Sequence, residues 1–296
     1  MKNFAYRVCG ACQKRYDPTA NECPHCHREH PIEGNELFEH DVHVGWIKNL
    51  LFLLVGFAGF QIIGYLVALF SQSAFLLSNN LHASKEELTR MLEEYVKQPS
   101  YSMLVNGLAY AIVFAILLLI LGKHIKIYLR GFRGWKPYVA GLVGFFALIV
   151  TSISWSFIVN IIRPNTGENA NQSTIVSLAI AYPVLSLLIF GVIGPVCEEF
   201  TYRIGLFSLC KRFSRILAYI VTPLVFGLIH FGWSSIPEGG AALITELLNI
   251  PDYIFAGVIL AYLYDRYGIG ASTTAHIFNN AFSFFQIFIL HAMGQI

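Results

Sequence analysis

Two adjacent carboxylates, Glu198 and Glu199, and the nearby Arg203 interrupt a long apolar stretch of the sequence. A charged side chain at the centre of a bilayer costs about 2.5–3.5 kcal/mol on insertion scales, so such residues tend to be paired and functional. In a helix, Glu199 and Arg203 share one face because they are four residues apart, and they can neutralise each other. Glu198 points about 100° away around the same helix and therefore needs other partners.

The partners available downstream at membrane depth are two histidines and an amide. Glu198 and His230 each lie 16 residues from Ser214, which stands in a short basic turn. Two antiparallel helices joined at this turn would place both side chains at the same depth. His276 and Asn280 are four residues apart and share one face of the last apolar helix. The sequence therefore predicts that a carboxylate, two imidazoles and an amide converge inside the bilayer.

Such a cluster can hydrolyse a peptide bond. A carboxylate in a low-dielectric cavity can act as general base toward water. One imidazole can orient that water, and a second imidazole together with an amide N–H can stabilise an oxyanion. Two histidines and a glutamate are also a ligand set for zinc, so the residues leave a metal-assisted mechanism open. A purely structural role is open as well, because polar side chains often hydrogen-bond between membrane helices.

Three motifs, taken together, are specific. They read Glu198-Glu199-x-x-x-Arg203, Phe226-x-x-x-His230 and His276-x-x-x-Asn280. They resemble the motifs of the CAAX protease and bacteriocin-processing (CPBP, Abi) family of intramembrane proteases, and the resemblance covers about residues 175–290. One departure is minor: the Arg-Gly step common in the family is Arg203-Ile204 here, with Gly205 one place later.

The resemblance implies a role for each motif residue. It implies that Glu198 activates water with the help of His230. It implies that His276 and Asn280 stabilise the oxyanion. The supporting residues are Glu199, Arg203 and Phe226. Dependence on glutamate alone or on a metal stays open, and the sequence has no H-E-x-x-H motif of the zincin type.

The composition indicates an all-α polytopic membrane protein. Of 296 residues, 55% are hydrophobic and 13% are charged, whereas soluble domains carry about 25% charged residues. Several uncharged runs exceed the roughly 20 residues that span a bilayer, and they do not alternate as barrel strands do. We expect about 7–8 transmembrane helices, over residues 46–70, 103–121, 138–162, 174–194, 216–231, 241–264 and 271–292.

Charges outside these spans predict the orientation. The loop from Lys123 to Lys136 holds five basic residues and no acid, which indicates the cytoplasmic side. The N-terminus lacks the apolar core of a signal peptide and is expected on the same side. Residues 71–100 are expected outside, where Ser84 to Glu87 form a capping box for an amphipathic helix.

One measure of depth conflicts with the predicted cluster. His276 lies roughly 9 Å along its helix from the nearest turn, whereas Glu198 lies roughly 24 Å from its own turn. If both turns are cytoplasmic, a kink at Pro195 or Pro251, a tilted helix or a re-entrant segment must reconcile them.

Residues 1–30 form a separate predicted unit. Cys9-x-x-Cys12 and Cys23-x-x-Cys26 are two knuckles that can close a tetrahedral zinc site. Two disulfides are the alternative, which a reducing cytoplasm disfavours. So small a segment needs its metal to fold, and it resembles the zinc ribbons attached to many bacterial membrane proteins. Neighbouring alternative ligands or bystanders are His25, His27 and His30.

Together these patterns predict the domains, the function and the partners of the protein. The domains are a zinc ribbon (1–30), a linker (31–45) and a transmembrane domain (46–296) that holds the protease core. The expected function is that of an intramembrane endopeptidase in a prokaryotic plasma membrane, with the ribbon cytoplasmic. Its expected partners are the lipid bilayer, a membrane-associated protein or peptide substrate and a protein at the ribbon, but no nucleic acid. The alternative is a non-catalytic scaffold, or a bacteriocin-immunity or transport-regulating protein.

Overall fold

The structure is a computed structural model that describes residues 7–9, 14–16, 23–27, 41–42, 44–79, 84–164 and 166–296. The predictions made for Cys12, for His30 and for residues 31–40 of the linker therefore lie outside the described residues.

The described chain is all-α apart from one small antiparallel sheet, in which β1 (Arg7–Val8) pairs with β2 (Arg15–Tyr16). Three of the helical segments, η1, η3 and η4, are π-helical, and η2 is a 3₁₀ turn. In chain order the helices are α2 (Trp46–Leu54), η1 (Val55–Gly59), α3 (Phe60–Asn79), α4 (Lys85–Val96), α5 (Pro99–Leu121), η2 (Gly122–His124), α6 (Ile125–Arg130), α7 (Lys136–Ile162), α8 (Ala170–Ala181), α9 (Pro183–Leu188), η3 (Ile189–Ile193), α10 (Gly194–Glu198), η4 (Glu199–Phe207), α11 (Ser208–Lys211), α12 (Arg215–Leu228), α13 (Ser235–Glu238), α14 (Gly240–Tyr267) and α15 (Ile269–Ala292).

The prediction of an all-α polytopic membrane protein is confirmed. By length and composition, five helical runs of the described chain can cross a membrane: Trp46–Asn79, Pro99–Leu121, Lys136–Ile162, Pro183–Lys211 and Gly240–Tyr267. Two further expected spans are present as helices. Helix α12 is apolar but only 14 residues long, and the first half of α15 carries buried polar residues.

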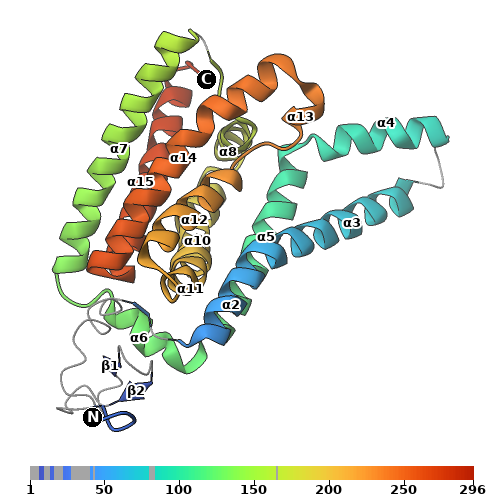
Figure 1. The fold of residues 1–296 in the computed structure, drawn as a ribbon. Helices are drawn as coiled ribbons and strands as arrows, with labels where there is room; N and C mark the ends of the chain where they lie inside the picture. Colours follow the sequence, from blue (N-terminus) through green and yellow to red (C-terminus); the bar gives the residue numbers. More distant parts are fainter. Residues whose placement is uncertain are drawn as a thin grey trace.

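The first helical run is longer than its sequence pattern indicated. Helices α2, η1 and α3 continue for 34 residues to Asn79, whereas the sequence pattern ended the first span at residue 70. Helix α4 then runs back beside α3 (Figure 1), and Ser71 Oγ lies 2.7 Å from Tyr95 OH. The expected capping box is present, because Ser84 accepts a hydrogen bond from the Glu87 amide.

The helix that carries Glu198 lies in the middle of the molecule. Figure 1 shows α7, α15 and α14 on one side of α10 and α12, and the pair α3 and α5 on the other. The segments α2 and η1 approach η4 closely because glycine removes side chains from the contact. A Cβ at Gly56 would overlap the Thr201 side chain, and one at Gly205 would lie 2.9 Å from the Leu53 nitrogen. Small residues of this kind allow membrane helices to pack backbone to backbone.

The π-helical turns make backbone carbonyls available to side chains. A π-turn replaces the i→i+4 pattern by i→i+5 and is often found at functional sites. In η4 the carbonyl of Ile204 accepts a hydrogen bond from Asn49 of α2. In η3 the carbonyl of Phe190 accepts one from Asn280 of α15. These bonds tie the central helix to both of its neighbours.

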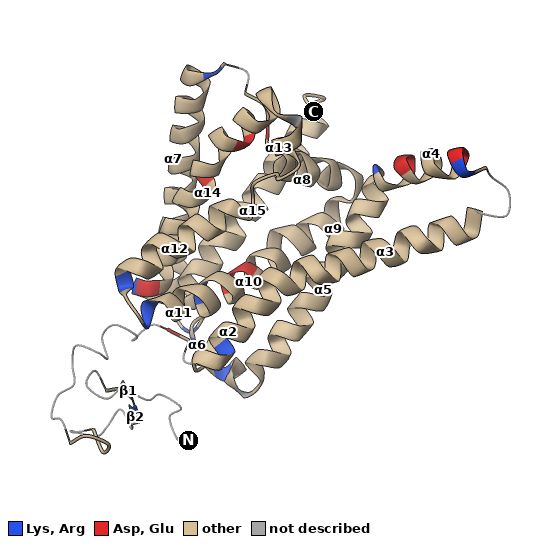
Figure 2. Ribbon diagram, turned by 45° about the vertical axis from the view of Figure 1, so that its right-hand side comes forward, with Lys and Arg blue, Asp and Glu red and all other residues tan. Residues whose placement is uncertain are grey.

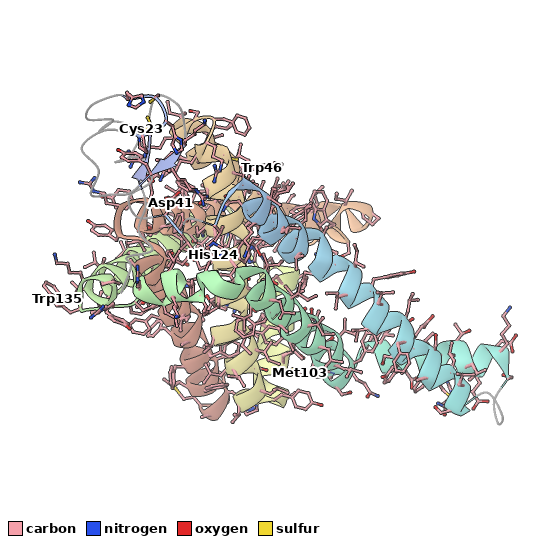
Figure 3. The ribbon with its side chains drawn as sticks, turned by 90° about the horizontal axis from the view of Figure 1, so that it is seen from below. Cys23, Asp41, Trp46, Met103, His124 and Trp135 are labelled. Atoms are coloured by element: carbon pink, nitrogen blue, oxygen red, sulfur yellow. The ribbon has the colours of Figure 1, made fainter. Side chains whose placement is uncertain are left out.

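A network of ion pairs joins the chain before α2 to the central helix. The buried ammonium of Lys211 lies 2.8 Å from Asp41 Oδ1 and 2.6 Å from Asp265 Oδ1. Asp41, Val42 and Val44 are themselves buried. Figure 2 shows basic and acidic residues together at this end, near α11 and α12. Figure 3 looks onto the same end, where Asp41 is labelled. The end of the predicted linker therefore packs against the helical core.

Candidate active site

The Glu198 carboxylate ends α10 and keeps limited contact with solvent, since its side chain is 16% exposed. Its Oε2 lies 3.5 Å from Nε2 of His276, and Tyr110 donates to its Oε1 at 3.5 Å. Both distances are longer than those of typical hydrogen bonds, so the two contacts are weak. The carboxylate therefore retains acceptor capacity for a water molecule. Tyr110 stands on α5, outside the three motifs, so no motif of the sequence marks it.

Glu199 is fully buried and makes the ion pair that its spacing predicts. Its Oε1 lies 3.4 Å from Nε of Arg203. The same oxygen lies 3.0 Å from Nδ1 of His276, a contact that the spacing could not reveal. Because a carboxylate oxygen accepts, Nδ1 carries the hydrogen and the opposite ring nitrogen, Nε2, faces Glu198. His276 thus stands between the two adjacent glutamates.

His230 follows the last turn of α12 and is held by its own helix. Its Nδ1 lies 2.7 Å from the Phe226 carbonyl oxygen, so Nδ1 donates and Nε2 keeps its lone pair. Its ring stacks on that of Tyr253, with centroids 4.2 Å apart and planes at 10°. Tyr253 stands on α14 and is a second contact residue that the motifs did not identify.

Phe226, predicted as a supporting residue, packs against three members of the site. Its ring centroid lies 5.0 Å from that of His230 and 5.9 Å from that of His276. The guanidinium carbon of Arg203 lies 5.1 Å from the same centroid, which is within the range of a cation–π contact. Phe226 therefore contacts both imidazoles and the arginine and helps to hold them in place.

The turn after His230 is held by a buried carboxylate from α14. Glu246 is 4% exposed and accepts hydrogen bonds from the amides of Gly232 and Ala170, each at 2.8 Å. A Cβ at Gly232 would lie 2.9 Å from Glu246 Oε1, so glycine allows this close approach. Glu246 connects the His230 turn to the start of α8, and only the folded structure shows this.

Asn280 lies one turn beyond His276 on α15. Its amide nitrogen donates to the Phe190 carbonyl at 3.1 Å. An amide nitrogen carries two hydrogens, so one bond to the backbone fixes the group and leaves the second hydrogen as a donor.

Two cavities meet at Glu198 and His230. The larger, of about 630 Å³, is lined by all four predicted catalytic residues: Glu198, His230, His276 and Asn280. The smaller, of about 160 Å³, lies toward α3 and α5 and is also lined by Glu198 and His230. Tyr110 lines both cavities.

The conflict in depth disappears in the folded chain. Glu198 contacts His276. At the same time Lys211, 13 residues after Glu198, contacts Asp265, 11 residues before His276, so both helices reach the same end of the molecule. Between Glu198 and Lys211 the chain forms the nine-residue π-helix η4, so the α-helical rise on which the expected distance rests does not apply over these residues. Helix α14 continues through Pro251 without interruption.

Three of the four predicted zinc ligands are brought together. The Sγ atoms of Cys9, Cys23 and Cys26 lie within 4.8 Å of one another, and those of Cys9 and Cys26 are 3.5 Å apart. A tetrahedral site with Zn–S bonds of about 2.3 Å separates its sulfurs by about 3.8 Å, whereas a disulfide needs about 2.05 Å. The donor set fits a zinc ion, and Cys12 lies outside the described residues.

A family model matches the part of the chain that contains the candidate site. Residues 180–282 match the family model described as "Type II CAAX prenyl endopeptidase Rce1-like". This match agrees with the resemblance that the three motifs carry, over a range that contains all of them. The roles assigned to the individual residues stay predictions.

One relative matches part of the chain. An "Uncharacterized protein" of Mycoplasma capricolum subsp. capricolum is 28% identical over 146 residues, which is 46% of this chain. The chain covers 40% of the length of that relative. No solved structure matches the chain at a significant level.

Proposed function

We propose that this chain, which carries the Rce1-like family match over residues 180–282, is an intramembrane endopeptidase that hydrolyses peptide bonds of membrane-associated proteins or peptides. The observation that carries the proposal is the meeting of the Glu198 carboxylate with His276, at 3.5 Å, in a cavity that His230 and Asn280 also line.

The attack begins with a water molecule held between the Glu198 carboxylate and Nε2 of His230. Glu198 takes a proton from this water as its oxygen forms a bond to the carbonyl carbon of the substrate. Nε2 of His230 can accept the second hydrogen of the water, because its Nδ1 already donates to Phe226. Tyr110 donates to the other carboxylate oxygen and orients it.

The developing oxyanion receives hydrogen bonds from His276 and Asn280. His276 can donate from Nε2 while Nδ1 donates to Glu199 only when both ring nitrogens are protonated. Glu199 is therefore a positioning residue, which orients the imidazole and balances its positive charge. When the tetrahedral intermediate collapses, the C–N bond breaks and the proton held by Glu198 moves to the leaving nitrogen.

A cleavage assay in isotopic water tests this proposal. Purified protein in detergent is incubated with a proteome-derived peptide library in H₂¹⁸O, and new termini are identified by mass spectrometry. Each new C-terminal carboxylate should carry one ¹⁸O, and Glu198→Gln should abolish these products. Glu94→Gln, at an exposed position of α4, is the matched control and should cleave normally. If the wild type produces no termini beyond those of Glu198→Gln, the proposed hydrolysis is wrong.

A further inference from the structure

A carboxylate that the mechanism does not use lies deep in α14. Asp252 is the thirteenth residue of this 28-residue helix, about 18 Å from its start at 1.5 Å per residue. Ser152 of α7 donates to its Oδ2 at 2.9 Å, and no Lys or Arg of the described chain forms an ion pair with it. A carboxylate at such a depth is costly and usually has a functional partner.

Asp252 faces the cavity of the candidate active site. Asn249, Asp252 and Ala256 are spaced by three and four residues, so they share one face of α14, and all three line the larger cavity. The next residue, Tyr253, stacks on the ring of His230. The carboxylate is thus one residue away from a direct contact of the proposed catalytic cluster.

Apart from the His276 imidazolium, which Glu199 balances in the proposed mechanism, the charged side chains that line the cavity are acidic. Its lining includes Glu168, Glu198 and Asp252 but neither lysine nor arginine. In a medium of low dielectric constant, a carboxylate without a counter-ion attracts a cation more strongly than it would in water. The bond from Ser152 holds Oδ2 in place, and Oδ1 can accept a hydrogen bond from an incoming group.

We propose that Asp252 is a specificity-determining residue that binds a lysine or arginine side chain of the substrate, on the α7–α14 side of the scissile bond. This inference rests on the proposed endopeptidase function and adds the substrate class, a peptide with a basic residue close to the cleaved bond. An ammonium or guanidinium group would donate to Oδ1 and supply the missing counter-ion.

The bond between Ser152 and Asp252 also joins two helices, so loss of activity alone would not separate specificity from stability. Exchanging the charges of residue 252 and of the peptide separates the two effects. Peptides that differ at one position, with lysine, norleucine or glutamate there, are compared as ratios of kcat/KM. The wild type should prefer lysine over norleucine by about tenfold to a hundredfold, the range of a charge-assisted hydrogen bond. Asp252→Asn should bring this ratio close to one, and Asp252→Lys should favour glutamate.

A binding measurement separates failure of this inference from failure of the proposed function. In the Glu198→Gln background, fluorescence anisotropy gives the affinities of the lysine and norleucine peptides, again with and without Asp252→Asn. A preference for lysine that Asp252→Asn removes supports the subsite even if no peptide is cleaved. If the wild type cleaves or binds the lysine and norleucine peptides equally well, the proposed role of Asp252 is wrong. The proposed hydrolysis would not be affected by that result. Glu93→Gln on α4 is the control and should leave every ratio unchanged.

Discussion

Removing residues 1–45 should unfold the membrane domain, whereas removing residues 1–40 should leave it intact. The difference between the two truncations is the segment that holds Asp41, Val42 and Val44, all of them buried. Asp41 Oδ1 lies 2.8 Å from Nζ of Lys211, and its Oδ2 accepts from Ser208 at 3.3 Å. This segment is therefore part of the helical core, although the sequence places it in a linker.

The magnitude follows from the groups that lose partners. Removing one member of a buried ion pair costs about 3–5 kcal/mol when the other charge is left uncompensated. Without Asp41, Lys211 would keep Asp265 as a partner, so the loss should be smaller than this full cost. Asp265 is shared with Arg215, whose Nη2 lies 2.6 Å from Asp265 Oδ2, so the compensation is incomplete, and we expect the loss of the Asp41–Lys211 pair to cost about 2–3 kcal/mol. Each buried valine adds about 1.5–3 kcal/mol. The sum, about 5–9 kcal/mol, is comparable with the whole stability of a typical domain, about 5–15 kcal/mol.

The effect is measured by heating each purified variant in detergent and then determining, by size-exclusion chromatography, the fraction that is still monomeric at each temperature. The variant without residues 1–40 should unfold near the temperature of the full chain, and the variant without residues 1–45 should not accumulate as a monomer. Asp41→Asn in the full chain is a milder form of the change and should lower the unfolding temperature by several degrees. If both truncated variants unfold at the same temperature, the reasoning about Asp41 and Lys211 is wrong.

The other predictions concern catalysis, metal and orientation. Asn280→Ala should lower kcat by about 10²–10³ through loss of an oxyanion donor; a full rate on a cleaved peptide would exclude this role. Glu199→Gln should lower both kcat and the unfolding temperature, because Glu199 contacts Arg203 and His276 together; a change in stability alone would contradict its positioning role. Elemental analysis should find one zinc per chain, lost in Cys23→Ser; a metal-free wild type would refute the ribbon. A membrane-impermeant maleimide should label Arg90→Cys from outside intact cells but not Arg130→Cys, and the reverse pattern would invert the topology.

The sequence by itself determined what depends on composition and short spacing. Long apolar runs identify a helical membrane protein because a bilayer requires every backbone polar group to be satisfied within the helix. The interval of four residues paired Glu199 with Arg203, and the structure shows their contact at 3.4 Å. The three motifs indicated the family that residues 180–282 match. Each of these signals is local, so it can be read before the chain is folded.

The tertiary structure decided which distant residues meet and at what depth. Tyr110 contacts Glu198 across 88 positions of the sequence, and His276 contacts Glu199 across 77. Asp41 reaches Lys211 across 170 positions. No periodicity encodes such pairs, because they depend on how the helices tilt and pack against one another. The reason is physical: side-chain spacing along a helix fixes a face, whereas contact between helices is fixed by the close packing of all their neighbours.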